Sequence, residues 1–167
     1  MSESEVTRQP RYWAEHLSNR VLPALLSGAG GFLAIYILSL LSGSLELVLL
    51  VAPFGASCVL VFALPQSPLA QPKNVIGGHL ISAFIGICTF ALMGVHPLSF
   101  ALAVGLAIAA MQVTETLHPP AGADPIVVLL TGASWQFLLT PILAGTLIIV
   151  VVAFLYHRLI SRRGYPI

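Results

Sequence analysis

The stretch ETLHPPAGAD, from Glu115 to Asp124, places ionisable side chains inside an otherwise apolar sequence. Glu115 and His118 are three residues apart, so they would share one face of a helix that persisted that far. Histidine changes charge near neutral pH, and ionisable residues within membrane segments by default mark an ion pathway or proton relay. The spacing favours a proton-carrying pair. The alternative is that His118 only hydrogen-bonds the chain break and Glu115 lies at a wet interface.

A second group of ionisable residues opens the segment SPLAQPKNVIGGHLISA, where Lys73 and His79 flank the start of a helix. Lys73 is either an anchor at the membrane interface or a positive charge that attracts an anion to the pathway. His79 lies about one turn inside the span and is a candidate pathway residue.

Two chain breaks contain matching residues. At an offset of 67 positions, PFGASCVLVFAL (53–64) aligns with PAGADPIVVLLT (120–131), and proline, glycine and alanine coincide. Each break has the pattern of a helix start, because Asp124 precedes a proline and Ser57 occupies the matching position. Asp124 is therefore expected to be a structural cap.

Two helix N-termini that face a shared space would direct unsatisfied N–H groups and partial positive charge at an anion. The predicted substrate-binding residues of this site are Gly55, Ala56, Ser57, His118, Gly122 and Ala123. The alternative is that both breaks are proline and glycine kinks that serve helix packing.

The composition defines the elements that must position these residues. The chain has 167 residues, of which 57% are hydrophobic and only 8% charged, far from an average soluble domain. Such a sequence predicts an all-α, polytopic membrane helix bundle. Its apolar windows are Leu22–Leu41, Leu45–Leu64, Asn74–Gly94, Leu98–Leu117 and Phe137–His157.

The distribution of basic residues predicts that both termini face the cytoplasm, because arginines precede the first window and follow the last. An even number of crossings is then required. Two inverted repeats of three segments, over 22–94 and 95–157, would satisfy this, and so would four spans with two re-entrant elements. The membrane domain would cover 22–157, between a polar lead (1–21), with Tyr12 and Trp13 at the interface, and a basic tail (158–167).

The sequence favours a multi-pass protein of a prokaryotic inner (plasma) membrane, because the lead resembles neither a signal peptide nor a transit peptide. Nothing indicates a nucleic-acid partner, a cofactor or a metal, since one ExxH spacing supplies too few ligands. We expect no enzyme. A membrane enzyme using Glu115, His118 and Asp124 stays an alternative, as does a non-transporting sensor or assembly protein. A homo-oligomer is left open.

The motif HPPAGADP at His118–Pro125, together with PFGAS at 53–57 and SPLAQPKNVIGGH at 67–79, is similar to the HPP family of integral membrane proteins. Members of that family have been linked to nitrite transport in chloroplasts and cyanobacteria. The resemblance implies a transporter or channel for a small monovalent inorganic anion, with nitrite as the first candidate.

Overall fold

The computed structural model describes residues 17–167, which form helices and loops without any strand. The predicted all-α class is confirmed, whereas the interface position of Tyr12 and Trp13 lies outside the described residues. Within this range the longer helices are α2 (Leu22–Leu45), α3 (Ala52–Ala63), α4 (Pro72–Met93), α5 (Pro97–Val113), α6 (Asp124–Thr131) and α7 (Ala144–Tyr156). Shorter helical segments are η1 (Leu17–Val21), η2 (Pro68–Ala70), η3 (Pro119–Ala123), η4 (Leu138–Leu143) and η5 (His157–Ser161).

Three helices among the described residues are long and apolar enough to cross a membrane. They are Asn19–Leu45, which includes α2, Pro72–Met93, which is α4, and Leu138–Ser161, which includes α7. These helices confirm three of the predicted windows. A proline stands in the first turn of both α2 and α4, where its missing N–H costs nothing and its fixed φ suits a helix.

The predicted span Leu45–Leu64 is wrong, because the first break divides it. Helix α2 ends at Leu45, Glu46 adopts a left-handed conformation with φ of 54°, and α3 contains only 12 residues. At about 1.5 Å per residue, such a helix covers roughly 18 Å of a bilayer core of about 30 Å. Pro53 lies in the first turn of α3, where a proline is tolerated, so it suits the start of that helix.

The predicted span Leu98–Leu117 is also too long. Helix α5 ends at Val113, and Glu115 follows with φ of 54°, so the chain leaves the helix before the HPP motif. Residues 114–118 lead into the short 3₁₀ segment η3, and α6 then runs for only eight residues to Thr131. The second break is therefore a turn followed by a half-helix.

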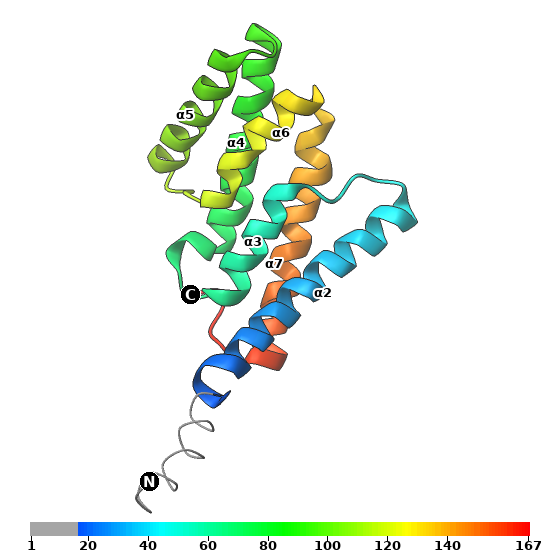
Figure 1. Cartoon of the computed structure of the whole chain (residues 1–167), viewed down its shortest axis with the longest axis vertical. Helices are drawn as coiled ribbons and strands as arrows, with labels where there is room; N and C mark the ends of the chain where they lie inside the picture. Colours follow the sequence, from blue (N-terminus) through cyan, green and yellow to red (C-terminus); the bar gives the residue numbers. More distant parts are fainter. Residues whose placement is uncertain (1–16) are drawn as a thin grey trace, which may run out of the picture.

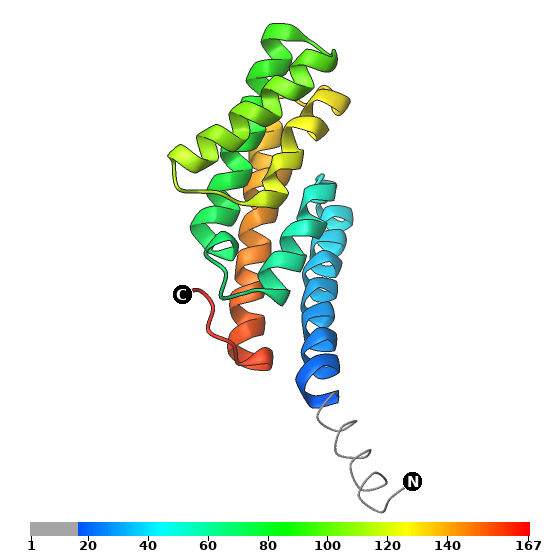
Figure 2. The ribbon, with the colours of Figure 1, turned by 60° about the vertical axis from the view of Figure 1, so that its left-hand side comes forward.

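The two halves of the described chain have the same order of elements, with a short helix between two longer ones. Figures 1 and 2 show that α2 and α4 run in one direction along the bundle and α3 in the other. In the second half the directions are reversed: α5 and α7 run opposite to α2 and α4, and α6 runs opposite to α3. Both short helices, α3 and α6, begin near mid-height and diverge from there, so their N-terminal ends lie close together at the centre of the molecule.

The C-terminal tail folds back onto the loop between α3 and α4. Gln66 Nε2 donates to the Gly164 carbonyl at 2.5 Å, and the Ile167 N–H donates to Gln71 Oε1 at 2.9 Å. Tyr165 is 6% exposed, and burial raises the pKa of its hydroxyl above the ordinary value. The end of the chain and the start of α2 lie at the same end of the bundle (Figures 1 and 2).

Candidate functional site

Four polar side chains are buried together where the two short helices begin. They are Ser57 of α3, His79 of α4, His118 at the start of the second break and Asp124 of α6, each with 0% of its surface exposed. We call these four residues the polar cluster. Ionisable side chains are almost never fully buried unless they are paired, and inside a membrane segment they usually serve a function.

Hydrogen bonds join the polar cluster into one chain. Ser57 Oγ lies 2.8 Å from Nε2 of His79 and 2.9 Å from Nε2 of His118. At one end, Nδ1 of His79 lies 2.7 Å from Asp124 Oδ2, and at the other, Nδ1 of His118 lies 2.8 Å from the Leu69 carbonyl oxygen. The order is carboxyl, imidazole, hydroxyl, imidazole, carbonyl.

Neither Ser57 nor Asp124 caps its helix, which corrects the predicted cap roles. The N-cap positions are Val51 for α3 and Ala123 for α6, and neither makes a side-chain cap hydrogen bond. Helix α3 begins at Ala52 and has Pro53 in its first turn. Ser57 lies five residues after Ala52, in the second turn. The N–H of Asp124 donates to the Ala121 carbonyl within η3, and its carboxyl group contacts His79 instead of capping α6.

Glycines of α4 allow the second break to approach the cluster. A β-carbon on Gly78 would lie 2.8 Å from both His118 Cβ and the Thr116 carbonyl oxygen. One on Gly86 would lie 2.8 Å from Pro125 Cα. Both distances are too short for non-bonded atoms, so α4 can contact the break this closely only where it has no side chain.

Polar side chains of α4 also donate hydrogen bonds to carbonyl groups of the second break. Ser82 Oγ donates to the Ala121 carbonyl at 2.6 Å, and Asn74 Nδ2 donates to the Leu117 carbonyl at 2.9 Å. Such contacts are required because irregular backbone at membrane depth must find its partners within the protein. Sequence reasoning did not single out Ser82, although it lies one turn after His79 on the same helix.

The expected Glu115–His118 pair is not formed. Glu115 projects away from the cluster with 84% of its side chain exposed, and its Oε2 lies 3.4 Å from Nζ of Lys73, which is 61% exposed. The prediction assumed a continuous helix, but α5 ends before Glu115. Lys73 and Glu115 instead form an exposed ion pair between the start of α4 and the second break.

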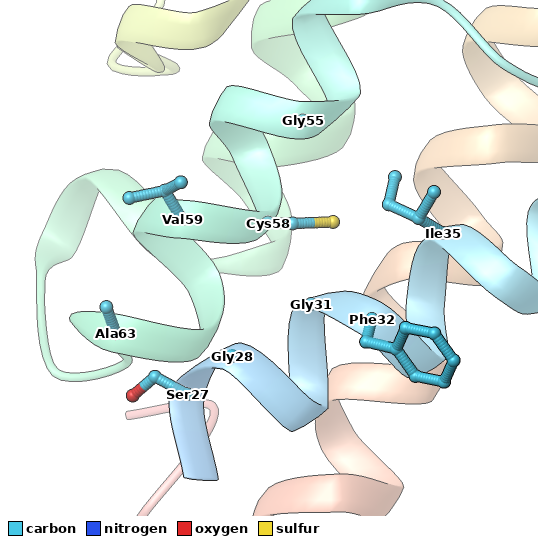
Figure 3. Close-up of a pocket in the computed structure, with 9 residues that line it drawn as sticks. All are labelled: Ser27, Gly28, Gly31, Phe32, Ile35, Gly55, Cys58, Val59 and Ala63. Atoms are coloured by element: carbon cyan, nitrogen blue, oxygen red, sulfur yellow. The ribbon is translucent and has the colours of Figure 1, made fainter. Parts of the chain in front are cut away.

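The remaining predicted substrate-binding residues lie around the cluster rather than in it. Gly122 and Ala123 are half-buried, whereas Gly55 and Ala56 are exposed on the outer side of α3. Gly55 lines a groove of about 520 Å³ between α2 and α3, formed by five residues of α2 and four of α3 (Figure 3). Its lining is mostly apolar, so this groove is no site for an anion.

The chain matches known membrane proteins over most of its length. The model of the HPP transmembrane region matches residues 17–166. One transmembrane protein of Dictyostelium discoideum is 38% identical over 130 residues, covering 73% of this chain and 46% of the relative. Another from that organism is 34% identical over 153 residues, covering 84% and 49%. The chain thus spans about half the length of these curated relatives.

No solved structure matches this chain. The family model includes both breaks and every residue of the polar cluster. The chain therefore belongs to the HPP family of transmembrane proteins.

Proposed function

We propose that this protein transports a small monovalent anion across the membrane, with nitrite as the first candidate, and that the polar cluster lies on the transport path. The observation that carries the proposal is the position of His79. Its two ring nitrogens contact Ser57 and Asp124, which occupy equivalent positions at the 67-residue offset. The two matched breaks thus meet at one imidazole.

Reciprocal contacts support an inverted repeat. A β-carbon on Gly78 would lie 2.8 Å from the Thr116 carbonyl, and one on Gly145 would lie 3.2 Å from the Leu49 carbonyl. Adding the offset to Gly78 gives Gly145, and subtracting it from Thr116 gives Leu49. Contacts exchanged in this way are expected when two similar halves face each other across a pseudo-two-fold axis.

The short helices supply the polarity that an anion requires. Helices α3 and α6 begin beside each other and diverge, so the positive ends of both helix dipoles point to the centre of the bundle (Figures 1 and 2). Asp124 would repel an anion if its charge were free, but its carboxyl group contacts His79. Because the cluster is fully buried, access from either side requires the two halves to move relative to each other.

We propose transport rather than catalysis, although Asp124, His79 and Ser57 are arranged in the order of a carboxylate–imidazole–hydroxyl triad. The Ser57 hydroxyl is fully buried and is surrounded by two imidazole nitrogens and, at 3.2 Å, the Pro53 carbonyl. A substrate carbonyl would have to displace these groups. A serine-directed fluorophosphonate probe separates the two functions, since labelling of Ser57 would favour the enzyme.

We further propose a plasma-membrane location with both termini in the cytoplasm. The start of α2 and the end of η5 lie at the same end of the bundle, as an even number of crossings requires (Figures 1 and 2). Arg20, Arg158, Arg162 and Arg163 belong to this end, which is the pattern of a cytoplasmic face.

Flux into liposomes tests the proposed function. Purified protein is reconstituted, and uptake of nitrite, nitrate and formate is compared with uptake into protein-free liposomes, because nitrous and formic acids cross bare lipid. A His118→Ala variant removes one end of the cluster. Protein-dependent uptake that falls at least tenfold in the variant is expected. The proposal is wrong if no anion enters faster than in the protein-free control.

A further inference from the structure

The hydrogen bonds of the polar cluster set the smallest number of protons that it can hold. The Leu69 carbonyl can only accept, so Nδ1 of His118, 2.8 Å away, must carry a hydrogen. If His118 is neutral, its Nε2 is then an acceptor and takes the Ser57 proton. Ser57 Oγ must in turn accept from Nε2 of His79, because a hydroxyl has a single hydrogen to donate.

The contact between His79 and Asp124 requires one more hydrogen. Nδ1 of His79 and Oδ2 of Asp124 lie 2.7 Å apart, and at this distance a proton must lie between them. Nε2 of His79 is already protonated in this arrangement. The pair is therefore either an imidazolium with a carboxylate or a neutral imidazole with a carboxylic acid, and both hold one proton more than aspartate with neutral histidine.

Rotation of the Ser57 hydroxyl between the two histidines moves this proton without changing the count. Donation to the Pro53 carbonyl, 3.2 Å away, would instead require hydrogens on both Nε2 atoms and a second extra proton. If Ser57 donates to His79 instead, Nε2 of His118 must carry the hydrogen and His118 becomes the imidazolium. If neither Nε2 carried a hydrogen, one of the two contacts to Ser57 would join two acceptors. The geometry points to a proton-binding site formed by Asp124, His79, Ser57 and His118, in which one exchangeable proton passes between the two halves of the molecule.

Burial supports the same count. With one extra proton the cluster has no net charge, whereas without it a negative charge, and with two a positive charge, would remain fully buried among apolar helices. The second carboxyl oxygen of Asp124, Oδ1, is also buried and has no hydrogen-bond partner within the described residues. A free carboxylate with a single hydrogen bond is costly in such a place, and sharing a proton with His79 removes much of that cost.

Other ionisable groups on the elements that pack against the cluster do not supply this proton. The Lys73–Glu115 ion pair is exposed, and Cys58 faces the groove between α2 and α3. On α7, the Tyr156 hydroxyl donates to the Leu26 carbonyl. Cys88 lies on α4 more than two turns beyond His79. Phe54 packs its ring edge-on against His79, with ring centroids 5.3 Å apart, and contributes no charge.

The inference rests on the proposed function for its consequence: the anion crosses together with the proton, so that net charge does not accumulate. Loading takes one proton from water on one side of the membrane, and unloading returns it to water on the other. The proton count itself rests only on the contacts within the cluster. The two claims can therefore fail separately, and each needs its own measurement.

Nitrogen NMR of histidine-labelled protein in lipid nanodiscs tests the proton count. Near neutral pH, one Nε2 of the His79 and His118 pair is expected to be protonated. Bare Nε2 on both histidines, or hydrogens on both, would overturn the proposal. Single His79→Gln and His118→Gln variants assign the signals. His157 is an internal reference, because its Nε2 faces the Val61 carbonyl at 3.0 Å and must be protonated.

An Asp124→Asn variant tests whether the carboxyl group holds the proton. Both imidazoles are expected to be neutral in this variant, each with one protonated ring nitrogen, because no carboxyl group remains to share the extra proton. An imidazolium on His79 or His118 in this variant would overturn the assignment. The proton count is measured by NMR on the wild-type protein. It can therefore be determined even if the Asp124→Asn variant fails to fold.

Proton movement with nitrate tests the coupling, because nitric acid is fully ionised and does not carry protons through bare lipid. A trapped pH dye is expected to report about one proton per anion, since the site holds one, and a proton signal at least tenfold smaller in Asp124→Asn. Nitrate flux without proton movement overturns the coupling. If no anion is transported at all, the proposed function is wrong, while the NMR result still decides the proton count.

Discussion

Ser57 and Asp124 contact opposite nitrogens of the same imidazole, with Ser57 Oγ 2.8 Å from Nε2 and Asp124 Oδ2 2.7 Å from Nδ1 of His79. Their residue numbers differ by the offset of 67 that aligns the two chain breaks. A single residue of α4 thus holds the start of both short helices.

Ser57→Ala is expected to destabilise the protein by about 1–3 kcal/mol, because two buried imidazole nitrogens lose their shared partner. Thermal unfolding in detergent measures the change. Thr146→Val is the matched control: Thr146 is the equivalent of His79 in the second half, is fully buried, and donates to the Ile142 carbonyl of its own helix. Equal unfolding temperatures for Ser57→Ala and wild type would contradict the hydrogen-bonded chain.

Gly78→Ala is expected to lower stability by about 1–3 kcal/mol, because the added carbon would overlap His118 Cβ and the Thr116 carbonyl. Gly28→Ala is the control, since a β-carbon on Gly28 of α2 meets nothing within 4 Å. Unfolding of both variants under the same conditions measures the difference. A Gly78→Ala protein as stable as the control would show that the second break does not pack this closely on α4.

Lys73→Gln and Glu115→Gln are each expected to change stability by less than about 1 kcal/mol, because the ion pair is exposed and screened by water. A double-mutant cycle from denaturant unfolding measures the coupling between the two residues. A coupling well above that limit would mean that the pair is shielded in the membrane. The effect of either variant on flux then tests the predicted pathway role of these residues.

Labelling of single cysteines tests the arrangement of the chain ends. In a protein whose Cys58 and Cys88 are replaced by serine, Arg20→Cys and Arg162→Cys are expected to react with a membrane-impermeant maleimide from the cytoplasmic side. Val95→Cys, in the exposed loop between α4 and α5, is expected to react from the opposite side. Reaction of positions 20 and 162 from different sides would exclude an even number of crossings.

The sequence predicted the long helices well because a span of about 20 apolar residues leaves few alternatives to a membrane helix. It did not predict where the helices end within those spans. Leu45–Leu64 and Leu98–Leu117 are apolar throughout, so composition does not reveal the left-handed turns at Glu46 and Glu115. The prolines correctly predicted that the chain breaks in both places. They did not predict the residue at which the helix before each break ends.

All residues of the polar cluster were candidates before the structure, but their partners were not predicted. Spacing along a chain shows which residues share a helix face, and it paired Glu115 with His118 on a helix that ends at Val113, before either residue. The contact between His79 and Asp124 depends on how α4 packs against α6, which sequence spacing does not determine. The offset of 67 was the one signal that related Ser57 to Asp124.

Anion flux through a His79→Gln variant tests the central claim most directly, because His79 joins both breaks. Nitrite and nitrate uptake is measured in liposomes that contain equal amounts of wild type, His79→Gln and the buried control Thr146→Val. The account predicts protein-dependent uptake that falls at least tenfold in His79→Gln and stays near the wild-type rate in Thr146→Val. Wild-type uptake by a correctly inserted His79→Gln protein would contradict it.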